Sequence, residues 1–152
     1  MTERPTLRVH RLSGSGASLP VYATPGAAGL DLSAALGAPV TLAPGQRMAI
    51  STGLIVALPP GHEGQVRPRS GLALRRGLTV ANAPGTIDED YRGELQVLLV
   101  NLSHEAQVIA PGDRIAQLIV APVTHVAVVE IVDEHALGAT ARGSGGFGST
   151  GG

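Results

Sequence analysis

The residues most capable of chemistry gather in the run NAPGTIDEDYRG, which starts at Asn82. Asp88, Glu89 and Asp90 follow one another there. Clustered carboxylates repel one another, and at least one of the three could act as a general base. A polar hairpin tip is the alternative explanation, because acidic residues commonly occupy turns. The Asn82 side chain carries both a donor and an acceptor, which suits it to read the edge of a nucleobase.

A second candidate site begins at Arg69, which precedes Ser70 and Gly71. After Pro68 the run SGLALRRG predicts the only helix, with Ser70 as its N-cap, arginines in its last turn and Gly77 as its stop. Free N–H groups at a helix start suit an anion, and Arg69 could add charge-assisted hydrogen bonds to a phosphate. An ordinary cap beside a surface arginine explains the same residues equally well.

The segment 142–152, RGSGGFGSTGG, holds six glycines in eleven residues. It contains too little apolar surface to order itself, so a solvated tail is the plain expectation. Against that expectation stands Phe147, the only phenylalanine of the protein. Three glycines satisfy the pattern G-x-G-x-x-G, but the helix and the later acid that dinucleotide binding requires do not follow. Backbone N–H groups of this segment could still wrap a phosphate, with Arg142 and Ser149 as further donors.

Short apolar runs must position these groups. The 152 residues suffice for one domain, in which Gly (21) and Pro (11) separate runs rich in Val, Ile, Leu and Thr. This pattern predicts many short strands joined by turns, that is, an all-β sandwich or barrel. Ala-Pro-Gly at 43–45 and again at 110–112 predicts two of the turns. The expected strands lie in residues 6–11, 40–42, 48–51, 54–58, 94–102, 107–109, 115–121 and 123–132.

Composition excludes several classes of protein. The absence of Cys excludes disulfides, thiolate metal sites and cysteine nucleophiles. All 11 basic residues are arginines, which excludes a Walker-type loop and a Schiff-base lysine. A net charge of −1, a pI near 6.5 and 2% aromatic residues argue against nucleic-acid binding. The five histidines lack the spacing of metal ligands.

No segment favours export or a membrane. The start of the chain, MTERPTLRVHRL, lacks the apolar core of a signal peptide. The longest stretch of low charge, residues 115–129, is short and contains polar residues, so it makes a poor membrane span. We therefore expect a cytoplasmic protein with no membrane partner.

Five segments, in this order and spacing, resemble the motifs of the trimeric dUTPases, the deoxyuridine 5′-triphosphate nucleotidohydrolases. The similarity spans essentially the whole chain. One such motif alone would be weak support, whereas five in order are strong support. The segments are AGLDL from Ala28, PRSGLA from Pro68, the run from Asn82 to Gly93, GDRIAQL from Gly112 and RGSGGFGS from Arg142.

The resemblance implies a jelly-roll-like β-barrel, the dUTPase-like β-clip, with one short helix. Residues 1–141 would form the barrel, and residues 142–152 a flexible glycine-rich arm that closes over bound nucleotide as a lid. A homotrimer is implied as well, with each active site assembled from three subunits. The implied reaction is Mg²⁺-dependent hydrolysis of dUTP to dUMP and pyrophosphate, which supplies dUMP for thymidylate synthesis and keeps uracil out of DNA.

Roles for individual residues follow from the same resemblance. Asp88 matches the general base that deprotonates the water attacking the α-phosphorus, and Asp90 is the second choice. Tyr91 matches the ring that packs beneath the deoxyribose. The remaining base and sugar contacts match Asn82, Thr86, Ile87 and Gln96.

The phosphate contacts are implied in the same way, by Arg69, Ser70, Gly71 and Gln117. In the arm, Phe147 would stack over uracil, while Arg142, Gly148 and Ser149 would close on the phosphates. Magnesium would be held by the triphosphate and water, with no direct protein ligand. Asp31 matches an acid with a structural role or an indirect role near the metal.

Two alternatives remain open from the sequence. A dCTP deaminase shares a related fold but performs different chemistry on the cytosine amine. A non-catalytic trimeric nucleotide-binding protein could also use this barrel, although it would be expected to carry degenerate motifs.

Overall fold

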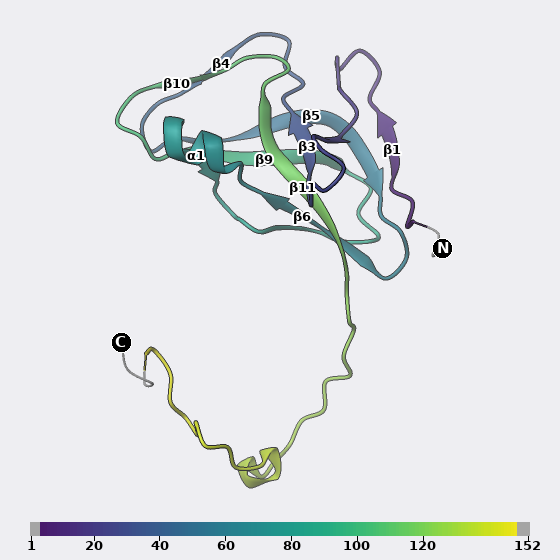
Figure 1. Ribbon diagram of the computed structural model, residues 1–152, viewed down its shortest axis with the longest axis vertical. Coiled ribbons are helices and arrows are strands. Elements are labelled where there is room, and N and C mark those ends of the chain that lie inside the picture. Colours follow the sequence, from purple (N-terminus) through teal and green to yellow (C-terminus); the bar gives the residue numbers. More distant parts are fainter. Residues whose placement is uncertain (1–3, 149–152) are drawn as a thin grey trace.

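The computed structural model describes residues 4–148, which form eleven strands, one short α-helix and one 3₁₀ helix (Figure 1). In chain order these elements are β1 (Arg8–Arg11), β2 (Val21–Tyr22), β3 (Leu30–Ser33), β4 (Val40–Leu42), β5 (Arg47–Ala57), β6 (His62–Arg67), α1 (Ser70–Arg76), β7 (Leu78–Val80), β8 (Gly85–Ile87), β9 (Glu94–Asn101), β10 (Gln107–Ile109), β11 (Arg114–Pro122) and η1 (Glu134–Leu137).

The strands form three antiparallel sheets. A four-stranded sheet has the order β1-β5-β9-β7, a five-stranded sheet has the order β2-β3-β11-β6-β8, and β10 pairs with β4. Within residues 4–148 the expected barrel is not closed, because the outer strands of each large sheet do not pair with one another. Closure into a barrel requires every edge strand to find a partner.

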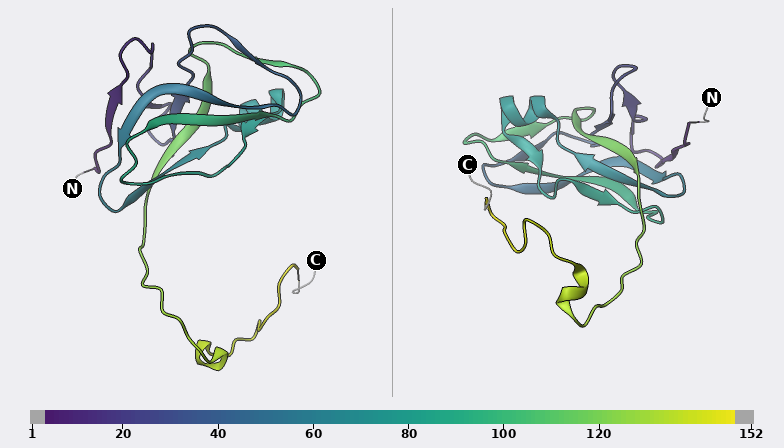
Figure 2. Two further views of the ribbon diagram at one scale, coloured as in Figure 1. Left: turned by 180° about the vertical axis from the view of Figure 1, so that it is seen from behind. Right: turned by 60° about the horizontal axis from the view of Figure 1, so that its bottom comes forward.

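The core lies between the two larger sheets, whose inward side chains belong to one buried cluster. Figure 2 shows the sheets from two further directions. In β9 the residues alternate, so that Leu95, Val97 and Leu99 are fully buried while Gln96 faces outward. Leu32, Leu118 and other residues of the five-stranded sheet meet them from the opposite side. Aliphatic residues supply all of this buried cluster.

Several strand predictions are confirmed, and others differ. The bounds predicted for β4 and β10 agree with the structure. The runs 48–51 and 54–58 join into the single strand β5, whose pairing with β9 shifts register between Ser51 and Ile55. Gly53 within this irregularity has a φ of 65°, which glycine adopts without strain. The strands β2, β3, β6, β7 and β8 were not predicted, since they are short or polar.

The predicted helix is confirmed, but its N-cap is not the predicted one. Ser70 is the first helical residue, and Arg69 is the N-cap with extended backbone and no side-chain cap. The carbonyl of Arg69 already accepts from the N–H groups of Leu72 and Ala73, so the helix starts one residue earlier than a Ser70 cap requires. Gly77 ends the helix as expected, with a φ of 62°.

Beyond β11 the chain leaves the sheets as an extended arm, here residues 123–148 (Figure 1). The strand predicted at residues 123–132 is wrong. High β-propensity is not sufficient there, because no neighbouring strand pairs with this segment. The arm also contains η1, which was not predicted and which the Asp133 side chain caps by accepting from the His135 N–H at 3.0 Å. No helix within residues 4–148 has the length and apolar character needed to cross a membrane.

Candidate functional site

Four of the predicted phosphate contacts surround one pocket of about 350 Å³, called here the Arg69 pocket. The turn before α1 supplies Arg69, and the first turn of the helix supplies Ser70 and Gly71. Strand β11 supplies Gln117 and β3 supplies Asp31, so three elements meet at the pocket. The rest of the lining is Ala23, Ala27, Ala28, Gly29 and Arg75.

An ion-pair network fixes the arginine at this pocket. The Nε atom of Arg69 lies 3.2 Å from Oδ1 of Asp31, and Nη1 of Arg114 lies 3.1 Å from Oδ2 of the same carboxylate. Nη1 of Arg69 also donates to the Arg114 carbonyl at 3.2 Å. The Asp31 carboxylate therefore links Arg69 to Arg114.

Gln117 is held in place by the segment that precedes the helix. Its Nε2 donates to the Pro68 carbonyl at 2.9 Å. A Cβ atom on Gly29 would lie 2.5 Å from Oε1 of Gln117 and 2.9 Å from Cδ1 of Ile119. A side chain at position 29 would therefore displace the ends of Gln117 and Ile119. No role for Gly29 was evident from the sequence, although it lies inside the first motif.

A second cavity of about 530 Å³ adjoins the Arg69 pocket, because Ser70 and Gln117 line both. Ala83 and Pro84 form its other side. The exposed residue Asn82 immediately precedes them. The first part of the run from Asn82 to Gly93 therefore lies beside the predicted phosphate contacts.

Asp88 lies in the middle of that run, directly after β8. Strand β8 runs antiparallel to β6, with Gly85 opposite Val66 and Ile87 opposite Gly64. Arg69 follows Val66 by three residues, and Asp88 follows Gly85 by three residues. Because the two strands are antiparallel, these two steps lead away from the pair in opposite directions. At the usual rise per residue of a strand, this separates the two by about 20 Å. One chain therefore does not bring the proposed base to the Arg69 pocket.

The Asp88 side chain is exposed and makes no hydrogen bond within the described chain, whereas its neighbours are tightly held. The Glu89 carboxylate accepts from the Gly61 N–H at 2.7 Å. The Glu94 carboxylate accepts from the Gly53 N–H at 2.9 Å and from the Ser51 hydroxyl. Glu89 and Glu94 thus anchor the part of the chain that follows Asp88, between β8 and the start of β9.

Tyr91 follows this anchored loop. Its hydroxyl donates to the Glu94 carbonyl at 3.1 Å, and its N–H donates to the Asp88 carbonyl at 3.1 Å. A Cβ atom on Gly93 would collide with the Tyr91 hydroxyl oxygen and lie 2.5 Å from Cζ of the same ring, so the ring position depends on glycine there. Glycine at 93 was part of the third motif, but its physical reason was not evident from the sequence.

The other predicted base and sugar contacts lie on β8 and β9, which belong to different sheets. Thr86 is exposed and pairs with Gln65, while Ile87 packs toward Gly64 and the core. Gln96 lies on the outward face of β9, opposite Ser51.

The predicted arm residues lie far from both groups. Arg142 Nε donates to the Gly145 carbonyl at 2.8 Å, a contact within the arm itself. Phe147 is fully exposed, with a φ of 50°, and Gly148 follows it with a φ of 83°. Figure 1 shows this part of the arm separated from the sheets. Ser149 lies outside the described residues.

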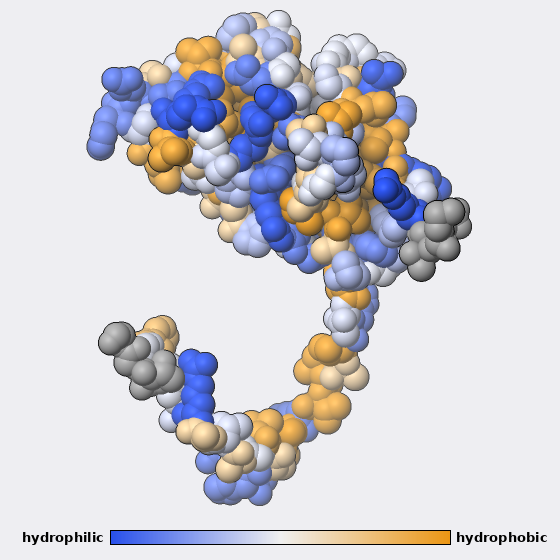
Figure 3. Space-filling model, viewed as in Figure 1, coloured by the Kyte–Doolittle hydropathy of each residue, from blue (hydrophilic) through white to orange (hydrophobic). Residues whose placement is uncertain are grey.

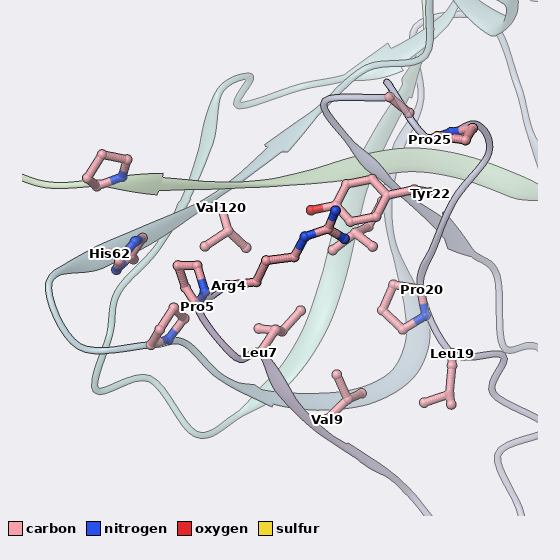
Figure 4. A pocket seen from close by; sticks show the side chains of 14 residues that line it. Arg4, Pro5, Leu7, Val9, Leu19, Pro20, Tyr22, Pro25, His62 and Val120 are labelled. Atoms are coloured by element: carbon pink, nitrogen blue, oxygen red, sulfur yellow. The ribbon is translucent and has the colours of Figure 1, made fainter. Parts of the chain in front are cut away.

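A larger cavity, of about 850 Å³, contains none of the predicted site residues. Its lining is mainly apolar, and Figure 4 shows Leu7, Val9 and Val120 pointing into it. It lies beside the end of β11, since Pro122 also lines it. We call it the apolar groove.

No cluster of three or more His, Asp or Glu residues within residues 4–148 is arranged to hold a metal ion. Both carboxylate oxygens of Asp31 contact arginines.

Sequence comparison identifies relatives along almost the full chain. The dUTPase family model matches residues 15–151. The deoxyuridine 5′-triphosphate nucleotidohydrolase of Methylocella silvestris is 58% identical over 154 residues, covering 99% of this chain and 94% of the relative. That of Rhizobium etli strain CIAT 652 is 58% identical over 151 residues, covering 97% and 95%.

Solved structures of dUTPases are also similar to this chain. A dUTPase of phage 80alpha has a TM-score of 0.84 at 27% identity, covering 98% of this chain and 99% of that chain. A Staphylococcus bacteriophage 80alpha dUTPase solved with dUpNHpp has a TM-score of 0.81 at 26% identity, covering 96% and 98%. The dUTPase of S. aureus phage phi11, described with a structural Mg(II) ion, has a TM-score of 0.76 at 25% identity, covering 84% and 97%.

Proposed function

The chain belongs to the dUTPase family and is a hydrolase acting on dUTP, and from this premise we propose how its residues perform the reaction. Water attacks the α-phosphorus, and its proton passes to the Asp88 carboxylate. The bond from the α-phosphorus to the oxygen that bridges to the β-phosphorus breaks, so that dUMP and pyrophosphate leave. The observation that carries this proposal is the Arg69 pocket, where Arg69, Ser70, Gly71 and Gln117 surround one space.

Asp88 is proposed as the general base because its carboxylate is exposed on an anchored loop. Glu89 and Glu94 are occupied by backbone N–H groups, which leaves Asp88 and Asp90 as the acids available to accept a proton, and the match to the third motif favours Asp88. A general base must lie within hydrogen-bond reach of the attacking water. A rigid loop on an exposed edge can present the carboxylate in this way to a substrate bound elsewhere.

Base and sugar contacts are assigned to the loop that carries Asp88. Asn82, Thr86 and Ile87 would read uracil and deoxyribose, and the Tyr91 ring would pack under the sugar. Gln96 would add a contact from β9. The hydrogen bond from the Tyr91 hydroxyl to the Glu94 carbonyl supports a fixed ring position.

We propose that the active site is shared between copies of the chain, in a homotrimer. The main support is the separation of about 20 Å between Asp88 and Arg69 along β6. A base on one copy can reach phosphates held on another only if the copies meet at this edge of the sheet. We also keep as a proposal the jelly-roll arrangement of the strands that the resemblance implies.

Two apolar surfaces also support assembly. Val126, Val128 and Val132 in the arm are 75%, 92% and 100% exposed, and Figure 3 shows apolar side chains along this part of the arm. The apolar groove lies near the root of the same arm, where the Val123 N–H donates to the Gly61 carbonyl. Exposed apolar surface of this kind is typical of an interface.

The C-terminal arm is proposed as a lid for the site of another copy. Phe147 would stack over uracil, while Arg142, Gly148 and Ser149 would close on the phosphates. Arg142 and Phe147 are exposed, so neither must leave a core to reach a nucleotide. The boundary between domain and lid, at residues 141 and 142, stays a prediction, as does a cytoplasmic location.

Magnesium is proposed as the cofactor, held by phosphate oxygens and water. When bound, a divalent cation offsets phosphate charge and orients the phosphorus for in-line attack. On the protein side, Arg69 and Gln117 would hold the phosphates, while Asp31 would act indirectly by orienting Arg69.

A substrate panel with isotopic labelling tests the proposed reaction. Purified protein with Mg²⁺ is given dUTP, dCTP, dTTP and UTP, and release of pyrophosphate and of ammonia is measured. We expect pyrophosphate from dUTP alone, and ammonia from none of them. In ¹⁸O-water the label should appear in dUMP. Ammonia released from dCTP would instead indicate a deaminase. Binding of nucleotide without turnover would indicate a non-catalytic protein. Label found in pyrophosphate would indicate attack at the β-phosphorus.

A further inference from the structure

Arg75 lines the Arg69 pocket, although the sequence indicated only that it belongs to the last turn of the helix. We propose that Arg75 is a further phosphate-binding residue, which adds a positive charge to this pocket. The inference rests on the proposed function, since it assumes that a triphosphate enters the pocket.

The charge at the pocket favours an anionic ligand. Asp31, Arg69 and Arg75 are the charged residues among those that line the pocket. The Asp31 carboxylate lies 3.2 Å from Arg69 and 3.1 Å from Arg114, so two arginines share its negative charge. A nucleoside triphosphate carries several negative charges, and Arg75 adds a positive charge that Asp31 does not pair with.

The position of Arg75 on α1 places its guanidinium beside Gly71. Arg75 follows Gly71 by four residues on α1, a spacing that places two side chains on the same face of a helix. A Cβ atom on Gly71 would lie 2.7 Å from Nη2 of Arg75 and 3.3 Å from its Cζ. The guanidinium therefore lies directly over Gly71, which is itself a predicted phosphate contact. Glycine at 71 leaves the space that this guanidinium occupies.

Arg75 and Arg76 differ in whether their guanidinium groups have hydrogen-bond partners. Arg76 donates from Nε to Oε1 of Gln107 at 2.9 Å and from Nη2 to the Val108 carbonyl. Arg75 is exposed and has neither a salt bridge nor a side-chain hydrogen bond to the described part of the chain. Its donors are therefore available to a ligand, whereas those of Arg76 hold α1 against β10.

The test compares Arg75→Gln with Arg75→Lys and with the control Arg76→Gln, which removes the same charge one residue away. Pyrophosphate release from dUTP gives KM and kcat. For Arg75→Gln we expect KM to rise about tenfold, the lower end for a lost charge-assisted hydrogen bond at an exposed site, with kcat changed far less. Arg75→Lys should keep most of the affinity, and Arg76→Gln should keep the parent KM.

Product inhibition locates the contact. Pyrophosphate should inhibit Arg75→Gln about tenfold more weakly than the parent, whereas inhibition by dUMP should change little. An unchanged KM, a loss confined to kcat, an equal loss in Arg76→Gln or a lowered Tm of Arg75→Gln would each overturn the inference. A parent protein that does not hydrolyse dUTP would instead overturn the proposed function, so the two failures are distinguishable.

Discussion

Arg69 and Asp31, which belong to different motifs, form an ion pair of 3.2 Å at the edge of one pocket. The Asp31 side chain is 12% exposed and that of Arg69 is 27% exposed, so the pair is partly shielded from water. Arg114 contacts the other oxygen of the same carboxylate. This carboxylate therefore orients the arginine proposed to bind phosphate.

Replacement of Asp31 by Asn should reduce turnover more than it reduces stability. A partly exposed ion pair contributes at most about 1 kcal/mol to the free energy of unfolding. Loss of orientation at Arg69 should nevertheless reduce kcat/KM by about tenfold or more. Urea unfolding and steady-state kinetics on the same preparations measure the two effects. Parent kinetics in Asp31→Asn would contradict a positioning role.

Asp88→Asn should abolish most of the turnover while the protein remains folded. Removal of a positioned general base lowers kcat by about 10²–10⁴-fold. Asp90→Asn is the matched control, because it removes the same charge two residues away, and we expect it to retain most of the activity. Pyrophosphate release from dUTP is the measurement. If Asp90→Asn loses the activity and Asp88→Asn keeps it, the base has been assigned to the wrong residue.

Mixed oligomers should recover activity from two inactive variants. Because Asp88 and Arg69 lie at opposite ends of β6, a shared site can combine Asp88 of an Arg69→Ala copy with Arg69 of an Asp88→Asn copy. With random mixing of equal amounts, about one site in four should be intact. Co-expression with two different tags allows the mixed species to be isolated and assayed. No recovery in such a species would show that both residues must come from one chain.

Deletion of residues 142–152 should leave folding and assembly unchanged but sharply reduce turnover. The described part of this segment, residues 142–148, contributes nothing to the buried cluster, so we expect no lowering of Tm. In the full-length chain, Phe147→Ala removes only the proposed stacking ring. Base stacking on an aromatic side chain contributes about 1–3 kcal/mol, so affinity for dUTP should fall at least about fivefold. Unchanged kinetics in both proteins would make the arm a simple linker.

Gly29→Ala should weaken phosphate binding although the substitution changes no charged residue. The added methyl group would collide with Oε1 of Gln117 and with Cδ1 of Ile119. We expect Gln117 to shift from Pro68 and the dUTP KM to rise, with a cost in stability of about 1–3 kcal/mol for overpacking. Gly26→Ala is the control, because a Cβ there meets nothing within 4 Å. Equal effects of the two substitutions would contradict this account.

Local signals in the sequence were sufficient for some elements and insufficient for others. Gly77 stops the helix, and Gly45 and Gly112 take positive φ values in the two predicted turns, since these conformations depend on the residue itself. Strand β6, with the sequence HEGQVR, was missed because its polar residues hide the pattern of a strand. It is a strand because β8 and β11 pair with it on either side. Pairing between distant segments overrides local propensity.

The sequence by itself determined the family, the dUTP-hydrolysing activity and the predominance of strands, because motifs and turn residues are properties of short segments. Only the tertiary structure decided where those motifs lie. It brings Asp31, Arg69 and Gln117 to one pocket and carries Asp88 to the far end of β6. It also leaves residues 123–132 unpaired despite their apolar sequence. Register and packing fix these relationships through contacts between distant residues, and no local pattern contains that information.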